Sequence, residues 1–230
     1  MQTESSSNHR NLEQLDFLSL VQGINREDAL LSARVASEAS HIAALCELVF
    51  DRLNAGGRLF YMGAGTSGRL GIVDASECPP TYGVPFDKVI GIIAGGDGAI
   101  RKAVEFAEDD EEQGFRDLEA YGVNEKDVVI GIAASGRTPY VIGALRTCRS
   151  KGIATGGVVC NKESKMRAVC DVCVEVETGP EFVTGSTRMK AGTATKMVVN
   201  MITTSVMIRL GHVKDNKMID MQLTNHKLIA

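Results

Sequence analysis

The stretch "YMGAGTSGRL", residues 61–70, decides the fold class, because it places three glycines directly after an apolar segment. Gly63, Gly65 and Gly68 have the spacing G-x-G-x-x-G, which is typical of a turn that leads from a strand into a helix and presents backbone N–H groups to an anion. A dinucleotide-binding fold needs an acidic ribose ligand about twenty residues further on. Residues 94–96, Ala-Gly-Gly, stand there instead. The stretch therefore favours a smaller anion than NAD, and the absence of G-K-[ST] argues against a Walker A loop.

Further short apolar runs alternate with helical patterns along the chain. The runs predicted to be strands are 58–64, 88–94, 127–134, 154–160 and 172–177. Strands separated by helices of about ten or more residues indicate βαβ units and a parallel sheet with helices on both faces. We therefore expect an α/β fold, a three-layer sandwich with a mainly parallel five-stranded sheet flanked by helices. Ligands of such sheets bind beyond the carboxyl ends of the strands.

The rest of the chain is predicted to be mainly helical. Residues 1–11 are polar and should form an arm, whereas 12–55 carry apolar positions at the spacing of two helices that end at Gly56-Gly57. Residues 188–211 should form a buried helix, and 221–230 also have a helical pattern. We expect residues 1–55 to pack on the core or on a dimer partner, and 56–230 to form the ligand-binding domain within a single globular unit.

Composition limits the possible partners and the compartment. The chain has 230 residues, 44% of them hydrophobic, and a formal net charge of −4, which disfavours nucleic acid and anionic membranes as partners. The six cysteines lie mostly in apolar runs and no signal peptide is visible, so a cytoplasmic protein with reduced thiols is expected. Cys170 and Cys173 form a C-x-x-C pair in a strand-like pattern, which favours a structural role. We expect no metal and no cofactor.

A second loop, "GIAASGRT" (131–138), repeats the chemistry of the first. Both follow an apolar strand and both read G-x-x-x-S-G-R, so backbone N–H groups and a serine hydroxyl converge at the start of a helix. A third polar stretch, 179–194, precedes the buried helix, which Ser186 or Thr187 could N-cap. Arginine or lysine in each loop favours a ligand with more than one negative charge. The alternative is that the glycines only make tight turns and the arginines are solvated.

The candidate phosphate- and substrate-binding residues come from these three loops. They are Gly65, Thr66, Ser67, Gly68 and Arg69 in the first, Ser135, Gly136, Arg137 and Thr138 in the second, and Glu181, Ser186, Thr187 and Lys190 in the third.

The loops G-x-G-T-S and A-S-G-x-T resemble those of the sugar isomerase (SIS) domain, which binds phosphosugars. More narrowly, residues 63–85, 91–114, 131–145 and 181–201 resemble the N-acetylmuramic acid 6-phosphate etherase family. The N-terminal "TESSSN" is similar to the Thr-Glu-x-x-x-Asn start of that family. Its members usually continue past residues 224–228 into a small helical segment that this sequence does not include.

The resemblance implies cleavage of the ether between an amino sugar 6-phosphate and D-lactate, by elimination and then hydration. Glu77 matches the proton donor of the family, and Glu108 matches its second carboxylate, which we interpret as the base. By sequence alone, Glu77 lies in an apolar, proline-ended turn whose partial burial would raise its pKa, or is a capping or surface carboxylate. Spacing alone does not choose Glu108 over Glu111 or Glu112, and an acidic run is usually a solvated helix face.

The polar arm and the apolar helices before Gly56 have more sequence than one small sheet needs to cover it, so we expect a homodimer with two-fold symmetry. The resemblance implies that the active site draws on both subunits, which would let the arm reach a neighbour's sugar pocket. Two other functions share the phosphosugar loops. One is a phosphosugar isomerase, which would leave the stretch "DASECPP" around Glu77 unexplained. The other is a non-catalytic phosphosugar sensor, like the glucokinase regulatory proteins.

Overall fold

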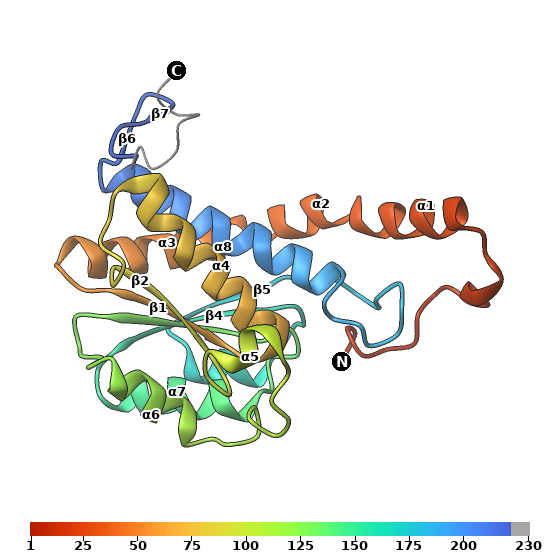
Figure 1. Cartoon of the computed structure of the whole chain (residues 1–230), viewed down its shortest axis with the longest axis horizontal. Coiled ribbons are helices and arrows are strands. Elements are labelled where there is room, and N and C mark those ends of the chain that lie inside the picture. The colour runs from red at the N-terminus through yellow and green to blue at the C-terminus, as the bar shows by residue number, and fades with distance from the viewer. Residues whose placement is uncertain (222–230) are drawn as a thin grey trace.

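The computed structural model describes residues 1–221, and its centre is one parallel sheet (Figure 1). The strands are β1 (Leu59–Gly63), β2 (Val89–Ile93), β3 (Val128–Ile132), β4 (Ala154–Val159) and β5 (Val172–Glu175). They are ordered β2-β1-β3-β4-β5, and every neighbouring pair is parallel. The predicted fold class and all five predicted strands are confirmed. Because strand order reverses between β1 and β3, the carboxyl ends of these two strands flank the crevice where such sheets bind ligands.

Helices cover both faces of the sheet, as Figure 1 shows. One face carries α3 (Ala39–Asn54), α4 (Gly65–Tyr82) and the long α8 (Lys190–Arg209), and the other carries α6 (Gln113–Ala120) and α7 (Pro139–Ser150). Each layer encloses its own cluster of buried side chains. Leu45, Tyr61 and Val198 belong to the first cluster, and Met62 and Tyr140 belong to the second. Beyond these and the N-terminal helices, the structure has short elements: η1 (Leu12–Gln14), α5 (Gly98–Arg101), η2 (Lys165–Val169), β6 (Val213–Lys214) and β7 (Lys217–Met218).

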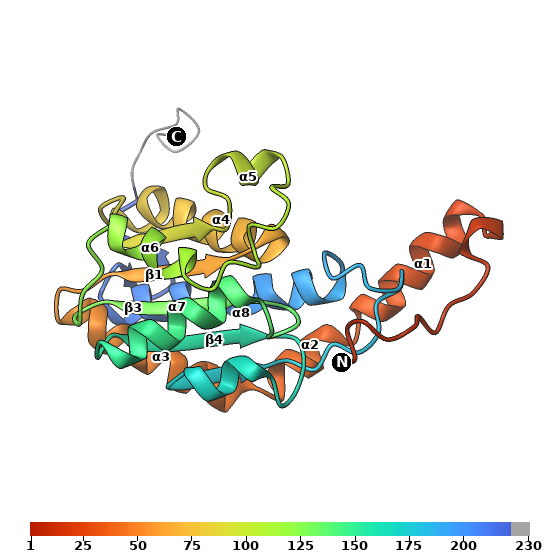
Figure 2. The same ribbon diagram turned by 90° about the horizontal axis from the view of Figure 1, so that it is seen from below.

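The N-terminal region contains three helices where the pattern predicted two. They are α1 (Phe17–Asp28), α2 (Leu31–Ala36) and α3. At the first break the backbone stays in the right-handed helical region, with φ −79° and ψ −18° at Leu30. At the second break Ser37 is still helical, with φ −65° and ψ −18°, whereas Glu38 departs from helical geometry, with φ −100° and ψ 9°. The apolar pattern did not reveal these local breaks. Figures 1 and 2 show α1 extending away from the body of the molecule.

Helix α4 runs through Pro79 and Pro80, so the proline-ended turn predicted around Glu77 is wrong. A residue before proline is normally biased away from helical geometry. Here Cys78 and Tyr82 are buried in the core, and that packing keeps the segment helical. The helix ends at Gly83, whose φ of 67° is the left-handed C-cap conformation that favours glycine. The predicted buried helix is confirmed as α8, whereas the helix predicted for 221–230 lies outside the described residues except for Met221.

Candidate active site

A pocket of about 250 Å³ opens at the carboxyl ends of β1 and β3. The start of α4 lines it with Gly65, Thr66 and Ser67, and the loop after β3 lines it with Ser135 and Thr138. Further lining comes from Gly185, Thr187, Gly192 and Thr195 around the start of α8, and from two carboxylate residues, Glu4 and Glu108. The fold thus brings the three predicted loops together around one pocket.

The β1–α4 loop leaves the N-terminus of an 18-residue helix facing this pocket. The N-cap residue Ala64 is extended and provides no side-chain cap, so the first backbone N–H groups of α4 have no acceptor inside the helix. Gly68 lets the start of α4 pack closely against β2, because a Cβ there would lie 2.6 Å from Cγ1 of Ile93. Free N–H groups and the helix dipole together favour an anion at this end of α4.

The β3–α7 loop adds hydroxyl groups to the same pocket. Gly136 has φ +66°, which lets the chain turn back between Ser135 and Thr138. The Ser135 hydroxyl accepts a hydrogen bond from the Arg137 N–H at 3.2 Å and keeps its own proton to donate. Thr138 is the N-cap residue of α7 but makes no capping bond. Its hydroxyl is therefore also available to a ligand.

The start of α8 is already capped, and neither Ser186 nor Thr187 caps it as predicted. The carboxylate of Glu181 accepts hydrogen bonds from the backbone N–H groups of Lys190, at 2.8 Å, and Ala191, at 3.0 Å. Glu181 is only 1% exposed, and this burial raises its pKa despite the two hydrogen bonds. Because an internal carboxylate occupies this helix end, the anion-binding capacity of the pocket lies at the other two loops.

The predicted cationic residues are placed around the pocket and do not line it. Arg69 donates to the carbonyl oxygens of Ile100 and Ala99, both at 2.7 Å, and so fastens α5 to α4. Buried Lys190 pairs with Glu27 on α1. Although partial burial pushes the pKa of Glu27 upward, the hydrogen bonds from Lys190 and His9 outweigh it and lower that pKa. Arg137 is exposed beside a neighbouring hollow. Direct contacts of these cations with substrate stay predictions.

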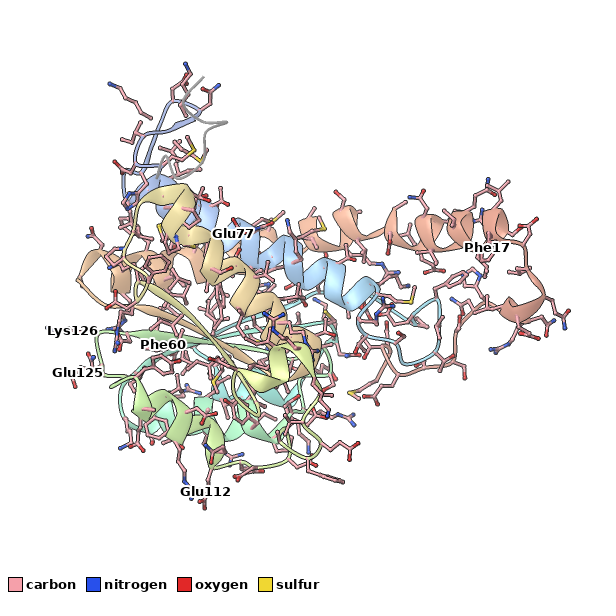
Figure 3. The ribbon with its side chains drawn as sticks, viewed as in Figure 1. Phe17, Phe60, Glu77, Glu112, Glu125 and Lys126 are labelled. Atoms are coloured by element: carbon pink, nitrogen blue, oxygen red, sulfur yellow. The ribbon has the colours of Figure 1, made fainter. Side chains whose placement is uncertain are left out.

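Geometry distinguishes among the acidic residues of the run 108–113. Only Glu108 of its three glutamates lines the pocket, and its carbonyl oxygen accepts a hydrogen bond from the Tyr140 N–H of α7 at 3.0 Å. Glu111 pairs with Arg146, and Glu112 pairs with Arg116. Figure 3 shows Glu112 at the outer edge of the molecule.

Glu77 does not line the pocket in the single subunit. It is exposed on α4, about three helical turns from the pocket-facing end of that helix (Figure 3). Of the alternatives left open for Glu77, partial burial or a capping or surface position, the single subunit shows an exposed surface position. Its exposed position leaves it open to contact from another molecule.

A second hollow of about 260 Å³ adjoins the first and shares Ala64, Gly65 and Glu108 with it. Its other walls are mostly small or apolar, among them Ala103 and Phe106. Glu108 thus stands between a polar pocket and a more apolar one.

Glu4 is a lining residue to which sequence reasoning assigned no role. The signal was present, since Glu4 belongs to the "TESSSN" stretch already compared with the N-terminus of the etherase family. Among residues 1–221, no group of three or more His, Cys, Asp or Glu side chains is arranged to hold a metal ion. None of the helices described is both long and apolar enough to cross a membrane.

Fold and pocket together define a SIS-domain protein. The sequence profile of the glucokinase regulatory protein N-terminal SIS domain matches residues 41–149, and that of the SIS domain matches residues 99–205. A candidate phosphosugar isomerase involved in capsule formation from Bacteroides fragilis has a similar fold, with a TM-score of 0.69 at 15% identity over 94% of this chain and 100% of that one. A phosphoheptose isomerase from Francisella tularensis gives 0.62 at 12% identity, over 85% and 100%.

Within that class, the chain belongs to the N-acetylmuramic acid 6-phosphate etherase family. It is 56% identical over 228 residues to the N-acetylmuramic acid 6-phosphate etherase of Christiangramia forsetii, covering 99% of this chain and 83% of that one. The identity to the enzyme of the same name from Porphyromonas gingivalis is 56% over 227 residues, with the same coverage. The family resemblance inferred from the motifs is confirmed.

Proposed function

We propose that this chain cleaves the D-lactyl ether of N-acetylmuramic acid 6-phosphate and releases N-acetylglucosamine 6-phosphate and D-lactate. The observation that carries the proposal is the composition of one pocket in a member of the etherase family. An uncapped helix N-terminus, the hydroxyls of Ser67, Ser135 and Thr138, and the carboxylate of Glu108 all line it. The helix N-terminus and the hydroxyls can bind a phosphate, and the carboxylate of Glu108 can act as a base.

The phosphate is held by neutral donors in this proposal. Backbone N–H groups at Gly65 and Thr66 and the hydroxyls of Ser67, Ser135 and Thr138 surround the pocket at the carboxyl ends of β1 and β3. Arg69 is committed to backbone carbonyls and acts on the site by positioning α5. Donors aimed at an anion from a rigid turn cost little reorganisation when the ligand arrives.

Glu108 is the proposed base of the elimination. In the open-chain sugar, the C2 proton is acidic because it lies beside the C1 aldehyde. Glu108 takes this proton, the C2–H electrons form the C2=C3 double bond, and the C3–O bond breaks with its electrons leaving on the lactate oxygen, which takes up a proton. Water then adds across the double bond, with its hydroxyl at C3 and a proton at C2. The route exchanges the lactyl ether at C3 for a hydroxyl with no net oxidation or reduction, so general acid and base groups can carry it without a redox cofactor.

Glu77 is the proposed acid. We propose that each active site receives this residue from the partner subunit. Two α4 helices packed antiparallel about a two-fold axis would set the Glu77 segment of one helix near the N-terminus of the other. Val73, 53% exposed, lies near the midpoint between Gly65 and Glu77 and would sit close to that axis. Each pocket would then receive its acid from the neighbour.

Helix α1 supports association because one of its faces is apolar and uncovered. Phe17, Leu18 and Val21 are 87%, 66% and 63% exposed, and Phe17 lies on the projecting helix in Figure 3. Their spacing puts them on one side of α1. A second copy of the chain could cover this apolar face of α1 and would also complete the active site. We therefore propose a homodimer with a shared active site.

We also place the protein in the cytoplasm. All six cysteines are free thiols in the structure, including the neighbours Cys170 and Cys173 of the C-x-x-C pair. Burial raises the pKa of Cys78 and Cys160 to about 12, which keeps them protonated and unreactive. This state suits a reducing compartment.

Product analysis tests the reaction. The purified protein is incubated with N-acetylmuramic acid 6-phosphate, and D-lactate and N-acetylglucosamine 6-phosphate are quantified; equal amounts of both are expected. The match to the glucokinase regulatory protein profile favours one alternative, a phosphosugar sensor. Binding without D-lactate release would support the sensor, and an isomerised phosphosugar that keeps its lactyl group would support an isomerase. Either result would contradict the etherase.

A further inference from the structure

We propose that Glu4 is a substrate-binding residue whose carboxylate accepts hydrogen bonds from hydroxyl or amide N–H groups of the bound amino sugar phosphate. The N-terminal arm presents it to the pocket of its own chain. This inference rests on the proposed function, because it assigns a new role within the same site. Its starting point is that Glu4 lines the pocket together with Glu108, Ser67 and Ser135 although it lies far from them in the sequence.

The first support is a buried attachment directly before Glu4. Thr3 is fully buried, and its hydroxyl accepts a hydrogen bond from Nδ2 of Asn161 at 2.8 Å. The Asn161 Oδ1 atom accepts from the backbone N–H groups of Gln2, at 2.9 Å, and Thr3, at 3.3 Å. The same Asn161 Nδ2 also donates to the Ala134 carbonyl at 2.9 Å. One buried amide therefore joins the arm to the residue that precedes Ser135 of the phosphate loop.

A second attachment follows Glu4. The hydroxyl of Ser7, which is 4% exposed, donates to the Phe182 carbonyl at 2.7 Å, and its backbone N–H donates to the Thr184 hydroxyl at 2.9 Å. Between the two attachments the chain turns, with the Ser5 N–H donating to the Gln2 carbonyl at 3.1 Å. Glu4 lies in this turn. The arm therefore bridges the end of β4 and the loop before α8 on its own chain, which differs from the expected reach to a neighbour.

Charge decides what Glu4 can contact. A carboxylate accepts hydrogen bonds and repels the phosphate and the lactyl carboxylate of the substrate. The phosphate must therefore lie at the uncapped start of α4, and Glu4 must face the neutral donors of the sugar. Sugar hydroxyls and the acetamido N–H are such donors, and a site that pairs with them rejects ligands that lack them.

The experiment compares ligand binding to the wild type, Glu4→Gln and the control Glu13→Gln, all without an N-terminal tag. Glu13 lies in η1 just after the arm, is exposed and does not line the pocket, so the control removes the same charge from the N-terminal region outside the pocket. Titration calorimetry uses N-acetylglucosamine 6-phosphate, glucose 6-phosphate and inorganic phosphate. Glu4→Gln should weaken N-acetylglucosamine 6-phosphate binding roughly 10- to 100-fold without weakening inorganic phosphate binding, and Glu13→Gln should match the wild type. A similar fold loss for glucose 6-phosphate assigns the contact to hydroxyls, and a loss confined to the acetamido sugar assigns it to the amide N–H.

Unchanged N-acetylglucosamine 6-phosphate affinity in Glu4→Gln would overturn the inference while leaving the proposed function intact. An equal loss of inorganic phosphate affinity in Glu4→Gln would also overturn the inference, because the substitution would then be disturbing the phosphate loops. If the wild type itself fails to bind the sugar phosphate, the proposed function fails first. The variant Thr3→Val removes the hydroxyl that accepts the hydrogen bond from Asn161 and should reproduce the loss of sugar phosphate affinity. The double variant Thr3→Val, Glu4→Gln should lose no more affinity than either single variant. Full affinity in Thr3→Val would contradict the role of the Thr3–Asn161 attachment in placing Glu4.

Discussion

Glu77 lies on the same helix as Gly65, twelve residues further on, so about 18 Å of α4 separate the proposed acid from the helix end that lines the pocket. Glu108, the proposed base, lines that pocket directly. Under the proposed function, one subunit provides the anion site and the base, and we propose that the acid comes from Glu77 of a second copy.

The two carboxylates should fail at different steps of one reaction. Glu77→Gln should still exchange the C2 hydrogen of the substrate with solvent deuterium but release little lactate, because an amide supplies no acidic proton. Glu108→Gln should do neither. Loss of either group should lower the rate by about 10² to 10⁴, the usual contribution of general acid or base assistance. Proton NMR in deuterated buffer follows the exchange, and an enzymatic assay follows the lactate.

The neighbouring acids provide the controls for that experiment. Glu111→Gln and Glu112→Gln remove exposed ion pairs with Arg146 and Arg116 and should leave both readouts near the wild-type values. Exchange kept in Glu108→Gln but lost in Glu77→Gln would reverse the two roles. Near-normal lactate release in both variants would show that neither carboxylate takes part in catalysis.

Each hydroxyl donor of the proposed phosphate site should contribute to sugar phosphate affinity. Ser67→Ala and Ser135→Ala should weaken N-acetylglucosamine 6-phosphate binding by about 1 to 3 kcal/mol, the range for a hydrogen bond to a charged group. Ser76→Ala is the matched control, because the Ser76 hydroxyl is exposed on α4 and donates to the Val73 carbonyl. Titration calorimetry measures all three variants. Equal affinity in all of them would place the phosphate elsewhere.

The apolar face of α1 should hold the dimer together. Replacing Phe17, Leu18 and Val21 by serine removes side chains that contribute little to the single subunit, since all three are exposed. The triple variant should sediment as a folded monomer with little activity. Phe86→Ser, which changes a side chain that is 80% exposed in the loop after α4, should stay dimeric. A fully active dimer of the triple variant would remove α1 from the interface.

Asp74 makes stability depend on pH. Burial raises its pKa from 3.8 to about 6, partly offset by hydrogen bonds from Thr203 and Asn200. Because the folded pKa is the higher one, the stability that Asp74 contributes is present below about pH 4 and is lost as the pH rises through about 6. Asp74→Asn should therefore gain stability relative to wild type between pH 4 and pH 7.5, by about 3 kcal/mol from the size of the shift. Urea unfolding of both proteins at the two pH values measures this gain. A difference in unfolding free energy between Asp74→Asn and wild type that is the same at both pH values would contradict the raised pKa of Asp74.

The sheet could be predicted from the sequence because each strand is a short apolar run followed by a glycine or polar turn. Val128–Ile132, for example, is buried at every position and leads directly into the serine loop. Two local features were not predictable in the same way. Helix α8 is capped by Glu181, nine residues before Lys190, and no local pattern reveals a cap at that separation. The prolines of α4 stay in the helix because Cys78 and Tyr82 are buried by elements distant in sequence.

The pocket was only partly predictable for a related reason. Ser67, Ser135 and Thr138 follow strand ends, so the topology of a parallel sheet brings them together. Arg69 belongs to the first of these loops and Lys190 to the third polar stretch, yet each has a partner within the chain that sequence spacing does not show. Spacing alone could not separate Glu108 from Glu111 and Glu112; the family resemblance pointed to Glu108, and in the structure Glu108 lines the pocket while the other two form ion pairs.

Subunit mixing tests the shared active site most directly. The inactive variants Glu77→Gln and Glu108→Gln are unfolded together, refolded as a mixture and assayed for D-lactate release, with each variant refolded alone as the control. In a mixed dimer, the Glu77→Gln subunit still has Glu108 in its pocket, and the Glu108→Gln subunit still provides Glu77 to that pocket. One of the two sites in the mixed dimer is therefore complete. Random pairing should restore about a quarter of the wild-type activity. Recovery near that level would support an acid supplied across the two-fold axis, and a mixture no more active than the separate variants would contradict it.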